Sequence, residues 1–413
     1  MTKHAQHQRH SRNDRILFIL DSPYPPVNRF NRTLINRAEL LSEKIKGIEI
    51  HVLSRGTNYS IVKHHDFTVH RIGLKKEMKI ERFDSIMERV KYSIMSFVYL
   101  LKVYRDVDVV ISMAFVANFI SFLYYFALRK NYVCDVVDFS FDADLAECQN
   151  NKIVHRILNN ILEFVECKVI PRFAKRVVVV SEAMKKTLVK KYGLKEDKII
   201  VMHEGIDPRI LSWAKEDCKE KSFLRQKYGL SGKKVIMITG FFDRFDRVDL
   251  LLKAIQELKL RHSDLKLVVA GAGDCHFKSL IGKLNDPDIV IIGWHRSRRD
   301  AYKVLQMADV CVIPMEKRLA TDVIYSSKLM DYIAYRKPVV AFNLETIAGI
   351  VIEYGIGEIA EKVDHHSLAK AIEKIIINLE KYQGAKFENL IEKFSMQNIS
   401  TLYPKLIRDV LTE

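Results

Sequence analysis

The sequence predicts an α/β protein made of two doubly wound, Rossmann-like domains that face a cleft. Short continuous apolar runs such as Arg15–Leu20 indicate strands that are buried on both faces of a parallel sheet. Segments with helical spacing follow these runs. The alternation continues to about residue 207 and restarts at Lys234. The length of 413 residues also exceeds what one domain usually holds, which favours two domains.

We expect the following boundaries along the chain: a disordered tail over 1–14, a first domain over 15–207, a helical connector over 208–232, a second domain over 233–385 and a helical segment over 386–413. The last segment either stays with the second domain or returns to pack on the first. Residues 1–14 are polar and give no secretory signal. His4, His7 and His10 have a spacing that permits metal binding, but a tail is the favoured interpretation.

In the first domain, strands are predicted over Arg15–Leu20, Ile48–Leu53, Thr68–Ile72, Val107–Ser112, Tyr132–Asp138 and Arg176–Val180, and helices over Thr33–Lys46, Phe115–Lys130, Ile153–Ala174 and from Ser181. The stretch Val109–Leu128 has twenty residues without a charge, which is long enough to span a membrane. We interpret it as a strand followed by a helix, because a strand directly after Asp106 and Asp108 repeats the rhythm of the chain.

In the second domain, strands are predicted over Lys234–Thr239, Leu265–Ala270, Ile289–Ile292, Val310–Pro314 and Val339–Phe342, and helices over Asp249–Leu258, Arg299–Met307 and Ser367–Lys381. The six cysteines of the whole chain are scattered without a Cys-x-x-Cys pair or a nearby histidine cluster. This distribution favours reduced thiols in the cytosol and argues against structural zinc.

The net charge of +16 is concentrated in the first half of the chain. Residues 1–210 carry 35 basic and 24 acidic side chains, against 32 and 27 in the rest. Nucleic acid and an anionic membrane surface both fit such an excess; no RNA-binding signature accompanies it, so we favour the membrane and no nucleic acid. The segment Gly73–Phe83 mixes lysines with apolar residues, and either lies on that membrane or forms a solvated loop.

Two stretches carry candidate chemistry. Asp135 and Asp138 end a predicted strand, where acidic groups of such sheets often act, and Asp142 and Asp144 follow in a loop that suits a cation or simple solvation. The second stretch, Pro314–Phe342, leads from one strand through a helix to the next.

The helix of this second stretch begins near Ser326 and Ser327, whose hydroxyls can cap it. Free amides, hydroxyls and Lys328 at a helix start favour a phosphate. Asp331, one turn further on, is suited to accept hydrogen bonds from a ribose diol. The residues therefore predict a seat for a nucleotide diphosphate.

These features resemble the glycosyltransferases of the GT-B fold, in particular family 4 or group 1. The matching pieces, in order along the chain, are Ser181–Leu188, His203–Asp207, Leu267–Gly273, Ile292–Trp294, Ala308–Pro314 and Ser327–Ala341. The resemblance implies a metal-independent, cofactor-independent transfer of a sugar from a nucleotide-diphosphate donor on the second domain to an acceptor on the first. It assigns the ribose to Asp331, the phosphates to Ser326, Ser327 and Lys328, and a close backbone approach to Gly240.

Several positions depart from the family pattern. Val323 stands where the resemblance implies a glutamate eight residues before Asp331, and five extra residues lie between Pro314 and Asp331. Asn28 and Arg29 replace a glycine pair in the first loop, where they present a cation to the diphosphate. Phe241 replaces an arginine, which leaves Arg244 or Arg247 as substitutes.

Asp138 lies where a related branch of inverting glucuronosyltransferases has its base. We therefore hypothesise that Asp138 is the general base on the acceptor hydroxyl, with helix capping as an equally weighted alternative. The expected enzyme transfers a sugar to a lipid-linked or nascent glycan acceptor at the cytoplasmic face of the cell membrane. The alternative is a GT-B protein that binds a nucleotide sugar as a partner subunit without transferring it.

Overall fold

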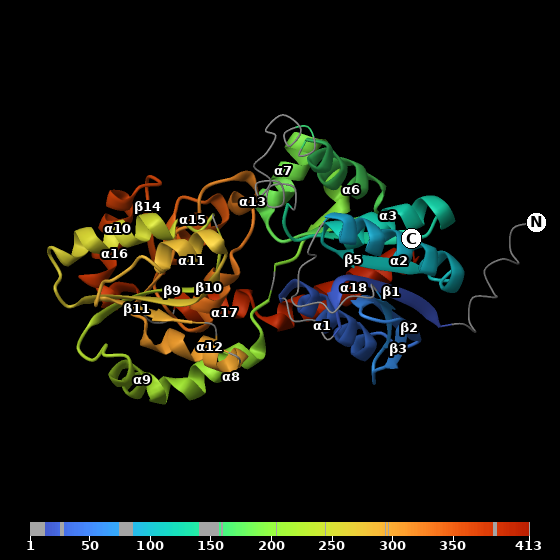
Figure 1. The fold of residues 1–413 in the computed structure, drawn as a ribbon. Coiled ribbons are helices and arrows are strands. Elements are labelled where there is room, and N and C mark those ends of the chain that lie inside the picture. Colours follow the sequence, from blue (N-terminus) through green and yellow to red (C-terminus); the bar gives the residue numbers. More distant parts are fainter. Residues whose placement is uncertain are drawn as a thin grey trace, which may run out of the picture. The chain divides into compact units, whose positions relative to one another are not determined.

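The computed structural model describes residues 13–24, 29–73, 86–139, 157, 160–203, 205–243, 245–293, 295, 297–382 and 386–412. The chain divides into two compact units, each with a sheet and surrounding helices (Figure 1). Unit 1 comprises Met1–His203 with Ile399–Glu413, and unit 2 comprises Glu204–Asn398. The segment Gly73–Phe83, which we expected to be amphipathic, lies almost entirely outside the described residues.

The sheet of unit 1 has eight strands among the described residues, in the order β3-β4-β2-β1-β5-β6-β7-β8. The strands are β1 (Asp14–Pro23), β2 (Ile48–Gly56), β3 (Ser60–Lys63), β4 (Thr68–Gly73), β5 (Val109–Met113), β6 (Asn131–Val136), β7 (Arg176–Val179) and β8 (Ile199–Val201). β3 pairs with β4 in the antiparallel direction, and the other neighbours are parallel. The sequence did not predict β3, because its four residues alternate between half-buried and exposed at the sheet edge.

The helices of unit 1 are α1 (Arg29–Lys44), α2 (Ile86–Val103), α3 (Phe115–Leu128), α6 (Ile170–Phe173), which continues a π-helical turn at Val165–Val169, α7 (Glu182–Tyr192) and most of α18 (Met396–Thr412). The predicted helix from Ser181 is α7, and Ser181 caps it, since the Met184 amide donates to Ser181 Oγ at 3.0 Å. The apolar stretch after Asp108 is β5 followed by α3, as predicted. Within the described ranges, we find no helix with the length and apolarity needed to cross a membrane.

The sheet of unit 2 has six strands among the described residues, all parallel, in the order β11-β10-β9-β12-β13-β14. The strands are β9 (Lys234–Phe242), β10 (Leu265–Gly273), β11 (Ile289–Ile292), β12 (Val310–Ile313), β13 (Val339–Phe342) and β14 (Gly357–Ala360). The residues of β12 and β13 are all buried, as the continuous apolar runs predicted.

The helices of unit 2 are α8 (Pro208–Asp217), α9 (Lys221–Lys227), α10 (Val248–Lys259), α11 (Cys275–Ile281), α12 (Arg298–Lys303), α13 (Leu319–Asp322), α14 (Ser327–Ala334), α15 (Glu345–Tyr354), α16 (His365–Ile376) and α17 (Lys386–Lys393). They pack on the sheet in two apolar clusters, one of which contains β9, β10 and α14 residues such as Met237, Val268 and Leu329. The other cluster includes apolar residues of α10 and α16.

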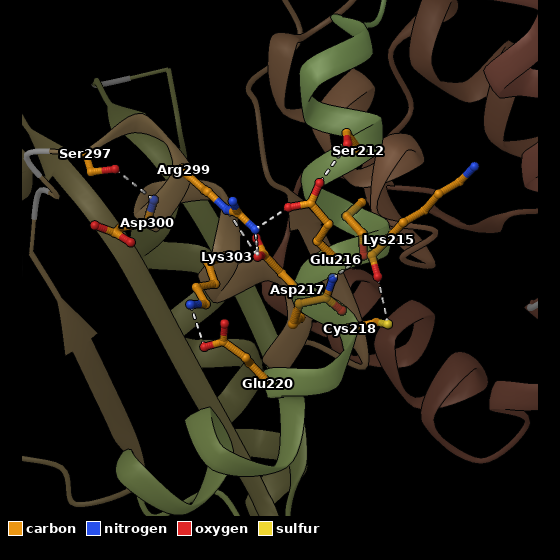
Figure 2. Close-up of polar contacts among 12 residues, drawn as sticks. Ser212, Lys215, Glu216, Asp217, Cys218, Glu220, Ser297, Arg299, Asp300 and Lys303 are labelled. Atoms are coloured by element: carbon orange, nitrogen blue, oxygen red, sulfur yellow. Dashed lines mark hydrogen bonds and ion pairs between the residues drawn. The ribbon is translucent and has the colours of Figure 1, made fainter.

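The stretch 208–232, which we expected to connect the domains, belongs to unit 2 and is held there by ion pairs (Figure 2). Arg299 of α12 contacts Asp217 at 2.8 Å and Glu216 at 2.7 Å, and Asp217 is fully buried. Lys303 pairs with Glu220 at 2.5 Å. A buried carboxylate needs such a partner, so these contacts fix α8 against α12.

Candidate functional site

The candidate donor site of unit 2 lies where β9 ends and α14 begins. Gly240 is near the end of β9 with a φ of 115°, a conformation that favours glycine. Beside it, Gly271 of β10 has a φ of 146°, and a Cβ there would lie 1.9 Å from the Gly240 carbonyl oxygen. The two glycines therefore let β9 and β10 approach closely at the carboxyl end of the sheet.

The loop after β9 is held against the end of β12. The Arg247 amide donates to the Pro314 carbonyl at 2.8 Å, and the Glu316 amide donates to the Phe245 carbonyl at 2.8 Å. Asp246 and Met315 form an antiparallel bridge between the same two segments. These backbone contacts fix the direction in which the Asp246 side chain projects.

Lys328 and Asp246 form a buried ion pair at this place. The Lys328 ammonium lies 2.8 Å and 3.0 Å from the two carboxylate oxygens of Asp246. The side chains are 12% and 3% exposed. Burial raises the pKa of Asp246, and the neighbouring Lys328 opposes that rise without cancelling it. Sequence reasoning found Lys328 but missed Asp246, because the contact joins residues 82 positions apart.

Lys328 also lies beside the backbone that the sequence singled out. Its Cε would be 3.4 Å from a Cβ at Gly240, so a larger residue there would meet the lysine side chain. Its ammonium is 5.6 Å from the centre of the Phe242 ring, within cation–π range. Gly240 and Lys328, both predicted, are therefore neighbours.

The start of α14 differs in one detail from the expectation. Ser326 occupies the N-cap position, but its side chain makes no capping hydrogen bond, and the Leu329 amide donates to the Ser326 backbone carbonyl instead. Ser326 is buried, Ser327 is exposed and Asp331 is half-buried. Ser326 is therefore the N-cap residue of α14, but it lacks the side-chain capping hydrogen bond that we expected.

Tyr332 of α14 forms a hydrogen bond with the strand β9. The Thr239 amide donates to the Tyr332 hydroxyl oxygen at 3.1 Å, and both groups are buried. A buried amide without a partner is costly, so this bond fixes the height of the helix relative to the strand. The five residues added before Asp331 fall in a segment that contains α13, and Asp322 accepts a hydrogen bond from the Glu345 amide at 2.6 Å.

Of the remaining predicted donor residues, Arg247 is the one whose side chain the structure describes. The guanidinium of Arg247 pairs with Asp249 through two contacts of 2.8 Å, so it is already engaged. Arg244 and Asn28 lie outside the described residues. Arg29 is the first residue of α1, and its side chain is not among those described. Val323 is 3% exposed, which buries the position of the implied glutamate.

In unit 1, the aspartates after β6 separate into two kinds. Asp135 is 1% exposed and pairs with the equally buried Arg37. The Asn118 amide donates to the Asp135 carbonyl at 2.9 Å, which ties the strand end to α3. Asp138 follows the strand and is half-buried, whereas Asp142 and Asp144 lie outside the described residues. Asp135 is thus structural, and Asp138 is the more accessible carboxylate.

The candidate metal ligands among the described residues lie outside these two places. Among the described residues, the one group close enough to hold an ion is Glu257 of α10 with His365 and His366 of α16. None of these side chains belongs to the predicted donor seat.

The two units match two family models, in chain order. Residues 30–210 match Glycosyltransferase Family 4, and residues 220–387 match Glycosyl transferases group 1. Together these matches take in most of the chain, which belongs to this family of glycosyltransferases and has the GT-B fold of two α/β domains.

Particular relatives agree with that class. The chain is 29% identical over 146 residues to an uncharacterized glycosyltransferase of Methanocaldococcus jannaschii. This alignment covers 34% of the chain and 36% of that protein. The alignments with curated relatives span 26% to 36% of the relatives' own lengths.

Solved structures share the fold over nearly the whole chain. Sucrose-phosphate synthase from Thermosynechococcus elongatus has a TM-score of 0.76 at 15% identity, covering 97% of this chain and 100% of that one. Anabaena HepE, solved in complex with UDP, has a TM-score of 0.66 at 14% identity, covering 96% and 99%. Identities this low establish the fold alone.

Proposed function

We propose that the protein transfers a sugar from a nucleotide-diphosphate sugar, bound at the start of α14, to a lipid-linked or nascent glycan acceptor at the cytoplasmic face of the membrane. The observation that carries the proposal is the position of Lys328. Its ammonium is fixed beside Gly240, at the carboxyl end of a parallel sheet, where ligands of open α/β folds bind. HepE, a structural neighbour, was solved with UDP, which supports a nucleotide donor.

The donor seat would work by positioning and charge. The first amides of α14 and the Lys328 ammonium would face the diphosphate, and Asp331 would accept hydrogen bonds from the ribose. The leaving diphosphate gains negative charge as the sugar departs, so these fixed donors stabilise the transition state more than the ground state. In this proposal the amides and Lys328 do the work that a metal ion does in other enzymes.

Asp246 would make donor binding at this seat depend on pH. It orients Lys328 but also places a carboxylate close to an incoming diphosphate. Because burial already raises the pKa of Asp246, donor binding would favour its protonation further. Donor binding would therefore be accompanied by proton uptake.

On the acceptor side, Asp138 would accept the proton of the attacking hydroxyl in an inverting reaction. Turnover should fall ~100-fold or more in Asp138→Asn if the carboxylate is the base. Donor affinity should stay unchanged, because in this proposal Asp138 acts on the acceptor hydroxyl and makes no contact with the donor. Near-normal turnover would refute this role.

The experiment that tests the donor site is calorimetric titration with UDP, ADP, GDP and their sugar conjugates. At least one nucleotide should bind, and Lys328→Met should weaken it about tenfold or more, as loss of a charge-assisted contact implies. Lys374→Met is the matched control, since Lys374 is an exposed lysine of α16 whose pair with Glu358 is 3.2 Å long. The proposal fails if no nucleotide binds or if both variants bind like the wild type.

One observation favours the alternative, a nucleotide-sugar-binding partner without transfer activity. Val323 puts a buried apolar side chain where the resemblance implies a glutamate. Transfer of a radiolabelled sugar to an added lipid-linked acceptor decides between the two functions. Donor binding without any transfer or donor hydrolysis would support the partner role.

A further inference from the structure

Large apolar side chains are unusually exposed on three helical segments of unit 1. We name α2, α3 with its cap Arg129, and the helical residues between 157 and 173 the helical layer. It holds nine of the nineteen exposed large hydrophobic residues among those that the structure describes: Val90, Ile94, Val98, Val103, Phe126, Ile157, Ile161, Phe164 and Phe173. Such a concentration of exposed apolar side chains on one surface usually marks a site of interaction.

The topology puts these helices on one side of the sheet. The connections from β4 to β5, β5 to β6 and β6 to β7 all run in the same direction across the strand order. Right-handed crossovers therefore place their helices on the same face. α2 packs against α3, and α3 packs against α6. Their outward sides thus form one continuous surface.

On α2 three of the exposed apolar residues form a stripe. Val90, Ile94 and Val98 follow each other at intervals of four and are 47%, 58% and 43% exposed. A groove of about 490 Å³ lies beside them, and its lining includes Ile94, Val98, Tyr59 and Lys102. This stripe has the form of a helix face that would normally be covered.

On α3 and α6 the exposed large apolar residues, Phe126 and Phe173, are aromatic. The Phe126 ring lies 5.1 Å from that of Phe173, and Phe122 packs within 4.9 Å and 5.8 Å of the two. The Arg129 guanidinium is 5.7 Å from the centre of the Phe126 ring. Aromatic rings beside arginine suit the boundary between lipid headgroups and acyl chains.

The charges of the layer have one sign. Its exposed charged side chains, among the described residues, are Lys91, Lys102, Arg129 and Arg172. Its acidic side chains are half-buried or buried, and Glu163 accepts hydrogen bonds from Lys191 and Tyr192. A protein partner or a second copy would normally be matched by mixed charges. A purely basic rim around apolar side chains complements an anionic surface.

We propose that the helical layer docks the protein on an anionic lipid bilayer, with the α2 stripe and the Phe126–Phe173 cluster inserted at headgroup level. The inference rests on the proposed function in one respect, because it names the surface at which a lipid-linked acceptor would be met. The docking itself needs no donor and no acceptor.

The test is sedimentation of the full chain with vesicles of phosphatidylcholine, alone or with about one third phosphatidylglycerol. The chain should bind the anionic vesicles and lose binding at high salt. Ile94→Ser with Val98→Ser, and Phe126→Ser with Phe173→Ser, should each weaken binding at least tenfold. Lys91→Gln with Lys102→Gln should weaken it about 25-fold, because each basic residue contributes about fivefold.

The matched control is Ile352→Ser with Ile377→Ser in unit 2, where the side chains are 69% and 60% exposed. It should bind vesicles like the wild type. The proposal is overturned if the wild type ignores anionic vesicles, or if the layer variants bind normally. It is also overturned if ultracentrifugation shows a dimer that only these variants dissociate. Nucleotide titration on the same samples keeps the outcomes separate, since vesicle binding without nucleotide binding contradicts only the proposed function.

Discussion

Replacing Lys328 with methionine should destabilise unit 2 in a strongly pH-dependent manner. The ammonium lies 2.8 Å from Asp246, a distance at which two unit charges attract by about 6 kcal/mol at an effective dielectric constant of about 20. Part of this attraction only offsets the loss of water around the buried groups. Breaking one side of a buried pair costs about 3–5 kcal/mol, because the remaining charge is stranded.

The sign of the pH effect follows from Asp246. Its pKa is raised in the folded protein, and removing the lysine would raise it further. The folded variant therefore binds more protons than the unfolded chain, and its stability increases as the pH falls. The deficit should be largest near pH 8 and shrink by about 1.4 kcal/mol per pH unit as Asp246 becomes protonated.

Urea unfolding followed by tryptophan fluorescence measures this effect. The chain has two tryptophans, Trp213 and Trp294, and both fall within the range of unit 2. Adding Asp246→Asn to Lys328→Met removes the stranded charge and should restore most of the stability at pH 8, but not nucleotide binding. A loss below about 1 kcal/mol in the single variant, or no recovery in the double variant, would refute the buried-pair argument.

Three further predictions concern the same region. Gly271→Ala should lower the free energy of urea unfolding by about 2 kcal/mol or more, since the new Cβ would meet the Gly240 carbonyl. Gly349→Ala in α15 is the control: its Cβ has open space, so the stability of the protein should not fall. Tyr332→Phe should cost about 1–3 kcal/mol by stranding the Thr239 amide; an unchanged midpoint would contradict this. Donor affinity measured by calorimetry should rise as the pH falls from 8 to about 5, and Asp246→Asn should abolish the dependence.

Much of the architecture could be predicted from local sequence patterns. Buried parallel strands such as β12 and β13 read as continuous apolar runs because both of their faces are covered. The uncharged stretch after Asp108 was resolved into β5 and α3 by the rhythm of the chain. The edge strand β3 was missed, because a strand at the edge needs no apolar run.

Only part of the candidate site could be predicted from the sequence. Lys328, Ser327 and Asp331 stand within five residues, so a helix start with phosphate-binding chemistry could be recognised locally. Asp246 and Thr239 could not, since they meet α14 from a strand and loop more than eighty residues earlier. The same holds for Asp135, which read as an acidic group at a strand end and proved to be the buried partner of Arg37.

The sequence by itself determined the fold class, the family resemblance and the choice of Lys328 as the lysine of the proposed donor seat, because periodicity and short motifs act over neighbouring residues. Only the tertiary structure decided that this lysine is paired with a buried carboxylate, and that the exposed apolar residues of α2, α3 and α6 share one surface. Both facts depend on which distant segments the sheets bring side by side, and the ion pair depends on how far water is excluded between them.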